Sequence, residues 1–219
     1  PMRPLFPKDY RNDVTLENLV LSVEQDCSPE LTAMLGAALA TSISDIPFDG
    51  PISTTQVGLV DGEFVFNPTA AQKEVSDLAL TVASTKEKVI MIEAGAKEVP
   101  EAKMIEAIFA AHDLNQKVIA FFDTIVAECG KPKHEYQSFA VPQELFDAIQ
   151  EIVPAAEMEE AVFTDDKQTR EENIRVITEK LEEAFADNEE WLAKLGEAVY
   201  QYQKKTVRKM ILKDHKRPD

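Results

Sequence analysis

The sequence is poor in several features by which protein classes are recognised. Its 219 residues include only two cysteines, seven glycines and one tryptophan. Two cysteines far apart in sequence form neither a disulfide framework nor a metal-binding spacing, so we expect Cys27 and Cys129 to be buried free thiols in a reducing cytoplasm. No run of 18 apolar residues occurs, which excludes a membrane-spanning helix. The first residues also lack the long apolar region of a secretory signal.

Motifs of common enzyme classes are also missing. There is no Walker-type loop, no GxGxxG and no nucleophile elbow. Glu93 and Glu98 flank a short AGAK loop and could do acid–base work. In a chain with 40 acidic residues such pairs also arise by chance, so we favour simple surface solvation. His112 falls on an apolar helical stripe, where a hydrogen-bonded histidine at a packed edge is expected.

Basic residues are scarce, and this bears on nucleic-acid binding. The formal net charge is −17, whereas phosphate affinity comes mainly from Lys and Arg. The charge is uneven, because residues 131–203 hold 18 acidic and 7 basic side chains, while residues 204–217 hold 7 basic and one acidic. We favour a solvated helix end for this basic run, with an RNA-contacting tail as the alternative.

Apolar residues make up 44% of the chain, enough for a packed core. Residues 15–24 alternate like a strand, and Ser28-Pro29 is typical of a helix start. Asp61-Gly62 between two apolar runs predicts a two-residue hairpin. A second hairpin follows, and residues 101–129 carry uninterrupted helical periodicity. This pattern predicts an α+β unit with a mixed or antiparallel sheet.

The pattern changes after Gly130. Residues 131–141 have the composition of a linker, and the rest of the chain contains only helical periodicity. We therefore expect a separate all-α bundle of about 80 residues, near the lower limit for an independent core. Trp191 is expected to anchor that core.

Four ordered motifs carry a resemblance to a known family. They read MRPLFPKDYRNDV, SDIPFDGPI, VGLVDGEFVFNP and VIMIEAGAKEVPEAKMIEAIFAAHD. Together they resemble the first ribonuclease-PH-like core of the bacterial polyribonucleotide nucleotidyltransferase (polynucleotide phosphorylase) family. The acidic segment resembles that family's all-helical domain, and VRKMILKDHKRPD resembles the entry into its second core. The resemblance implies a partial ribonuclease-PH-like α/β core followed by a separate all-α bundle.

The resemblance also implies a division of the chain and a truncation. The implied segments are the end of the first ribonuclease-PH-like subdomain (1–50), the second subdomain (51–130), the linker (131–141), the all-helical domain (142–210) and the start of the linker into the second core (211–219). We expect the chain to be an excised piece of a longer protein. In the family, SDIPFDGPI marks the passage between subdomains, so its apolar residues are expected to be seam packing.

The function implied by the resemblance is phosphate-dependent 3′→5′ degradation of RNA to nucleoside diphosphates in mRNA decay. Magnesium and phosphate act in the family's second core, so none is expected on this chain, which would have no catalytic or metal-binding residue. Arg3 matches an arginine near the family's RNA path and is the one expected RNA contact. The implied partners are RNA, further copies in a ring-shaped homotrimer and proteins of an RNA-degradation complex, in the cytoplasm. The alternative is a non-enzymatic protein-interaction module that uses the acidic helical bundle.

Overall fold

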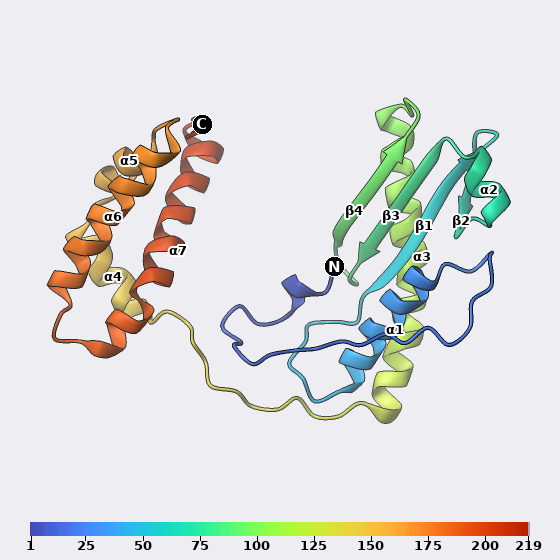
Figure 1. Ribbon diagram of the computed structural model, residues 1–219, viewed down its shortest axis with the longest axis horizontal. Coiled ribbons are helices and arrows are strands. Elements are labelled where there is room, and N and C mark those ends of the chain that lie inside the picture. Colours follow the sequence, from blue (N-terminus) through green and yellow to red (C-terminus); the bar gives the residue numbers. More distant parts are fainter. Residues whose placement is uncertain (219) are drawn as a thin grey trace. The chain divides into compact units, whose positions relative to one another are not determined.

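The computed structural model describes residues 1–218. The chain divides into two compact units, one reaching to Ser138 and the other beginning at Phe139 (Figure 1). The elements of the first unit are η1 (Arg3–Leu5), α1 (Pro29–Ile43), β1 (Ser53–Val60), β2 (Glu63–Phe66), α2 (Ala70–Val75), β3 (Leu78–Ser84), β4 (Val89–Ala96) and α3 (Glu101–Cys129). The α+β class predicted from the sequence is confirmed for this unit.

The sheet of the first unit has four strands in the order β2-β1-β3-β4, and every neighbouring pair is antiparallel. The β1–β2 hairpin closes with Val60 opposite Glu63. Its two turn residues, Asp61 and Gly62, have φ angles of 52° and 82°. Positive φ at both positions is what a type I′ turn requires, so the hairpin predicted from Asp-Gly is confirmed.

Helix α3 covers one face of this sheet. The core between them joins Val57, Leu80 and Val82 of the strands to Ala107 and Ala111 of the helix, all buried. Alanines at the contact let the helix backbone approach the sheet closely. The helical periodicity is confirmed, but the packed face runs through Ala107 and Ala111, while the apolar side chains of Ile105 and Phe109 are 53% and 62% exposed.

One polar side chain crosses this buried layer. The Asn115 carboxamide is fully buried; its oxygen accepts a 2.8 Å hydrogen bond from the Thr55 hydroxyl. Its nitrogen donates to the Val82 carbonyl at 3.1 Å and to the Ser84 hydroxyl oxygen at 2.7 Å. Since buried polar groups are costly only when unpaired, this network fixes the position of α3 along the sheet.

The segment SDIPFDGPI packs inward, as expected of a seam. The Phe48 ring lies 5.1 Å from that of Phe6, and the Asp49 N–H donates to the Leu5 carbonyl at 2.9 Å. A Cβ atom on Gly50 would lie 2.2 Å from the Phe48 ring, which only glycine avoids. Ile52 is 1% exposed.

Residues 15–24 do not form the predicted strand. The segment is extended but unpaired, and Leu19 and Leu21 are 83% and 87% exposed. Alternation makes a segment suitable for a sheet, but a strand exists only when a neighbouring backbone supplies hydrogen bonds. No such neighbour lies beside this segment within residues 1–218.

The expectation of buried thiols is also wrong. Cys27 and Cys129 are both exposed and free. Cys27 lies in the turn that precedes α1, and Cys129 is the last residue of α3, beyond the stripe that packs on the sheet. Both lie at helix ends, as the sequence indicated, but not on the buried side.

The second unit contains helices and no strand in its described part, residues 139–218. It consists of α4 (Gln143–Ile152), α5 (Ala155–Val162), α6 (Lys167–Ala184) and α7 (Glu189–Lys213) (Figure 1). Its core includes Leu145, Ile149 and Leu181, none of them exposed. Trp191 packs its ring edge-on against Phe185 at 5.1 Å, so the predicted tryptophan anchor is confirmed. In neither unit is a helix of residues 1–218 long and apolar enough to cross a membrane.

Candidate functional site

Arg3, the residue expected to contact RNA, is exposed in the single turn η1. The turn forms where Pro4 fixes its own φ and the chain continues into Leu5, Phe6 and Pro7. Arg3 lies on the wall of a surface hollow of about 720 Å³ that is made by the first part of the chain. Two further exposed cations, Lys8 and Arg11, line the same hollow. The structure therefore adds two residues to the one that the sequence singled out.

The wall of this hollow is attached to the segment after α3. The Tyr10 hydroxyl lies 3.2 Å from His134 Nε2, and the Tyr10 ring meets that of Tyr136 edge to face at 5.1 Å. The Asp9 carboxylate accepts hydrogen bonds from the hydroxyls of Ser138 and Tyr136. The bond from Ser138 lowers the pKa of Asp9 below its ordinary value. These contacts hold Lys8 and Arg11 on an ordered wall, although both lie in a loop.

The three cations of the hollow are available to a ligand. None of them lies within ion-pair distance of an acidic side chain in residues 1–218. A guanidinium nitrogen of Arg11 donates to the Lys8 carbonyl at 2.7 Å, which fixes the direction of the Arg11 side chain. Two guanidinium groups and one ammonium around one hollow suit phosphate oxygens. The short sequence PKDYR places Lys8 and Arg11 close to Arg3 and could have identified them. The net charge of −17 argued against RNA binding by the chain, so they were not singled out.

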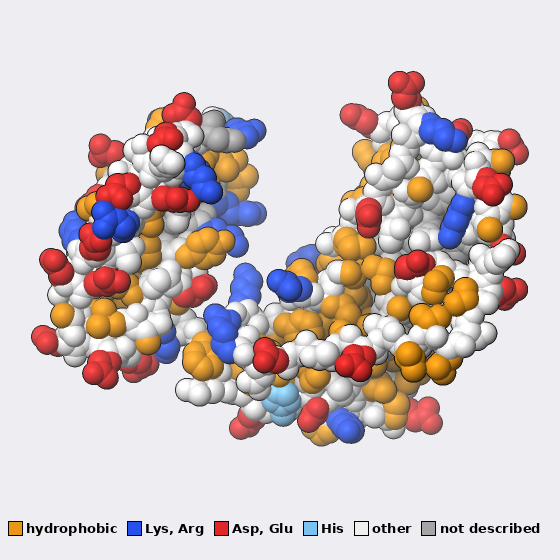
Figure 2. Space-filling model, in the orientation of Figure 1, with side chains coloured by type: hydrophobic (Ala, Val, Ile, Leu, Met, Phe, Trp, Pro, Cys, Tyr) orange, Lys and Arg blue, Asp and Glu red, His pale blue; other side chains and the backbone are white. Residues whose placement is uncertain are grey.

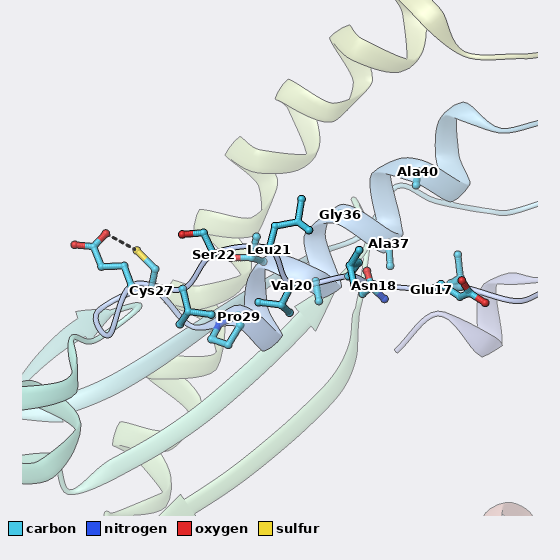
Figure 3. A pocket seen from close by; sticks show the side chains of 16 residues that line it. Glu17, Asn18, Val20, Leu21, Ser22, Cys27, Pro29, Gly36, Ala37 and Ala40 are labelled. Atoms are coloured by element: carbon cyan, nitrogen blue, oxygen red, sulfur yellow. Dashed lines mark hydrogen bonds between the residues drawn. The ribbon is translucent and has the colours of Figure 1, made fainter.

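A second hollow lies between α1 and the unpaired segment 16–24 and has a volume of about 530 Å³ (Figure 3). In Figure 3 the side chains of Val20 and Leu21 lie beside the small residues Gly36 and Ala37 of α1. The only side-chain hydrogen bond drawn there runs from the Cys27 thiol to the Glu24 carboxylate, 4.0 Å away. The lining of this second hollow is mostly apolar, and it holds no set of convergent polar groups suited to catalysis or to phosphate.

The acidic and histidine candidates are spread over the surface of the first unit. Glu93 lies on β4, and Glu98, which has a φ of 53°, lies just after the end of this strand. Both side chains are exposed. His112 is half-buried beside the Gln116 amide nitrogen at 3.3 Å, in agreement with the hydrogen-bonded histidine expected there. No group of three or more His, Cys, Asp or Glu side chains in residues 1–218 has the arrangement of a metal site.

The basic run 204–217 begins in the last part of helix α7, which extends to Lys213, and continues for four residues beyond it. Some of its cations have partners within the unit. The Lys209 ammonium pairs with Glu159, which raises the pKa of Lys209, and the Lys205 ammonium lies 3.8 Å from the Phe146 ring centroid. The expected helix end is therefore present up to Lys213, and contact of this run with RNA stays a prediction.

Comparison with known families assigns both units. Residues 50–113 match a family described as "3' exoribonuclease family, domain 2". Residues 144–219 match a family described as "Polyribonucleotide nucleotidyltransferase, RNA binding domain".

Individual relatives agree with these matches. A polyribonucleotide nucleotidyltransferase of Lachnoclostridium phytofermentans is 74% identical over 220 residues, which is 100% of this chain and 32% of the relative. Those of Ruminiclostridium cellulolyticum and Bacillus anthracis are 48% and 43% identical, again over 100% of this chain and 31% of each relative. The chain spans about a third of the length of these curated relatives.

The resemblance read from four motifs is therefore confirmed. Motif order, the antiparallel sheet, the helical unit and the identity over the whole chain all agree. From end to end, the chain matches a segment of the polyribonucleotide nucleotidyltransferase family.

Proposed function

We propose that this chain is part of a phosphorolytic 3′→5′ exoribonuclease of mRNA decay and serves there as scaffold and as a wall of the RNA path. The observation that carries this proposal is the hollow with Arg3, Lys8 and Arg11, three cations that have no ion-pair partner within residues 1–218, although Asp13 also lines the hollow and the net charge of the chain is −17. In phosphorolysis, inorganic phosphate attacks the terminal phosphodiester and releases a nucleoside diphosphate. A wall of cations holds the strand through its phosphates without reading its sequence.

Magnesium and phosphate belong to the proposed reaction, but the residues described here do not fit a magnesium site. Magnesium is held by carboxylates with water and substrate oxygens, and the acidic side chains of residues 1–218 form no such group. The proposal places neither the metal nor a catalytic residue on this chain. The ring-shaped homotrimer, the proteins of an RNA-degradation complex and the cytoplasmic location belong to the same proposal.

RNA binding by the chain of residues 1–219 tests the proposed path. Fluorescence anisotropy with a labelled oligoadenylate is compared between the unchanged chain and the triple variant Arg3→Ala, Lys8→Ala, Arg11→Ala. A single strand loses about 0.7 in the slope of log K against log salt for each phosphate contact removed. We therefore expect weaker binding and a slope that is smaller by about 2.

The matched control removes three exposed lysines elsewhere on the first unit, in the variant Lys73→Ala, Lys88→Ala, Lys117→Ala. It changes the net charge equally but leaves the hollow intact. Equal losses in both triple variants would show that only net charge matters, and the proposed path would then be wrong.

We also propose that the division of the chain follows the segments implied by the family, with the two units separable. Residues 131–138 are tied to the first unit, since Lys131 and His134 donate backbone hydrogen bonds to Ile43 and Asp45. Phe139, which is 41% exposed, begins the second unit. Limited proteolysis should therefore cut after Phe139 with chymotrypsin sooner than after Lys133 with trypsin. Faster cutting after Lys133 would contradict the anchoring of this segment.

A protein-interaction role is the second candidate, favoured by the acidic excess of residues 131–203. Figure 2 shows Asp and Glu side chains over much of the visible surface of the helical unit. Under this alternative the chain binds no oligoadenylate, and the triple variant of the hollow behaves like its control.

A further inference from the structure

Helix α7 carries a row of exposed side chains on the side away from the helical core. Tyr200, Lys204 and Arg208 follow one another at intervals of four residues, so they lie on one face. Each step along this row rises about 6 Å along the helix axis. Tyr200 is 57% exposed, and Lys204 and Arg208 are exposed as well. The buried face of the same helix is made by other residues, Leu195, Ala198, Val199, Tyr202, Thr206 and Met210.

The two cations of this row differ from the other basic residues of α7. Lys194 pairs with Glu190 at 3.3 Å, Lys209 pairs with Glu159, and Lys205 lies over the Phe146 ring. Lys204 and Arg208 have no ion-pair partner within residues 1–218. Their charge therefore contributes nothing visible to holding the bundle together and is free for a ligand.

The charge around the row also singles it out. In the helical unit, Figure 2 shows Lys and Arg side chains gathered along the margin that Figure 1 assigns to α7, while Asp and Glu predominate elsewhere. A polyanion is repelled from most of this unit and least from that margin. Glu197 is the acidic exception on the exposed face, one turn before Tyr200, where its carboxylate accepts a 3.0 Å hydrogen bond from Gln201.

We propose that the Tyr200–Lys204–Arg208 row binds single-stranded RNA. The Tyr200 ring offers a stacking surface for one base, while Lys204 and Arg208 contact the phosphates that follow. An exposed aromatic side chain next to unpaired cations is the combination by which proteins hold single strands without sequence preference. A duplex does not fit, because its bases are already stacked on one another. The inference rests on the proposed function, that the protein handles RNA, and names residues within residues 144–219 that do so.

The test measures anisotropy of a labelled oligoadenylate with the chain of residues 1–219 at several salt concentrations. For Lys204→Ala with Arg208→Ala we expect weaker binding and a salt slope smaller by about 1.4, the value for two lost phosphate contacts on a single strand. For Tyr200→Ala we expect about tenfold weaker binding with an unchanged slope, because stacking involves no counterion. For Glu197→Gln we expect tighter binding, since one repelling charge is removed.

The control variant is Lys167→Ala with Arg175→Ala on helix α6, which removes the same charge from another helix of the same unit. Circular dichroism of every variant verifies that the helices are intact. A labelled polyglutamate peptide serves as a second probe, because it is a polyanion without bases.

The outcomes separate this inference from the proposed function. Loss of affinity in the row variants but not in the α6 control supports the row. Unchanged affinity in the row variants overturns the row as an RNA site. If the triple variant of Arg3, Lys8 and Arg11 still loses affinity in that case, the proposed RNA path is supported independently. Polyglutamate binding as tight as RNA binding overturns the row as an RNA site. A chain that binds no oligoadenylate overturns both.

Discussion

The ammonium nitrogen of Lys133 lies 2.7 Å from the carbonyl oxygen of Ser44, although 89 residues separate the two in the chain. The same nitrogen also donates to the carbonyls of Thr41 and Ser42, at 3.3 and 2.9 Å. The last carbonyls of a helix have no partner within the helix, and a cation there also matches the negative end of the helix dipole. Lys133 therefore closes the end of α1 from a distant part of the chain.

Removal of this ammonium should destabilise the first unit. For Lys133→Met we expect a loss of about 1 kcal/mol in the free energy of unfolding, because the carbonyls exchange a charged donor for water. Urea denaturation followed by circular dichroism measures the change. The control is Lys131→Met, whose contact with Ile43 runs through the backbone and is retained. Equal effects of the two substitutions would contradict the role of the ammonium.

The Asn115 network gives the largest expected effect. Asn115→Ala removes three buried hydrogen bonds and leaves the Thr55 and Ser84 hydroxyls without this partner. We expect a loss of about 3 kcal/mol in the stability of the first unit, measured by urea denaturation. Gln116→Ala, next to it on the half-buried side of α3, should cost less than about 1 kcal/mol. A small effect at Asn115 would mean that packing alone positions α3.

Two tyrosines on α7 allow the contribution of a buried hydroxyl to be compared with that of an exposed one. The Tyr202 hydroxyl donates to the Val153 carbonyl at 3.0 Å inside the bundle, whereas Tyr200 is exposed. Tyr202→Phe should lower the stability of the helical unit by about 1.5 kcal/mol, because a buried carbonyl loses its donor. Tyr200→Phe should change it by less than about 0.5 kcal/mol. Fluorescence of Trp191, the only tryptophan, reports the unfolding of this unit.

The buried hydroxyl of Tyr202 predicts that the stability of the helical unit depends on pH. Burial, and after it the charge of Glu159, raises the pKa of Tyr202 above its ordinary value of 10.0. The folded unit thus holds the phenolic proton more tightly than the unfolded chain does. Its stabilising contribution is complete below pH 10 and is lost as the pH rises through the folded pKa. Unfolding curves at pH 8 to 11 should show this fall, and it should be smaller in Tyr202→Phe.

The hairpin turn gives a prediction about backbone geometry. Asp61 has a φ of 52°, a region that β-branched residues resist. Asp61→Val should lower the stability of the first unit by about 1 kcal/mol, while Asp61→Asn should change it little, since asparagine tolerates this conformation. Amide hydrogen exchange in β1 and β2 locates the effect. Faster exchange spread evenly over the unit, instead of at the hairpin, would contradict the assignment.

The local features of this protein were determined by its sequence. Ser28 caps α1 by accepting a hydrogen bond from the Leu31 N–H, and Pro29 occupies the first turn, as the Ser-Pro pair indicated. The turn at Asp61-Gly62 and the long helix α3 also follow from residues close together in the chain. Caps, turns and helices are set by interactions over a few residues, so a single sequence contains the information they need.

Features that need a distant partner were decided only by the tertiary structure. Residues 15–24 have a strand pattern without a paired backbone, and Cys129 ends a helix on its exposed side. Lys8 and Arg11 join Arg3 because Tyr10 and Asp9 are attached to residues 134–138, far along the chain. The physical reason is the same in each case. Burial, strand pairing and the convergence of charges depend on which segments meet in space, and periodicity within one segment does not contain that information.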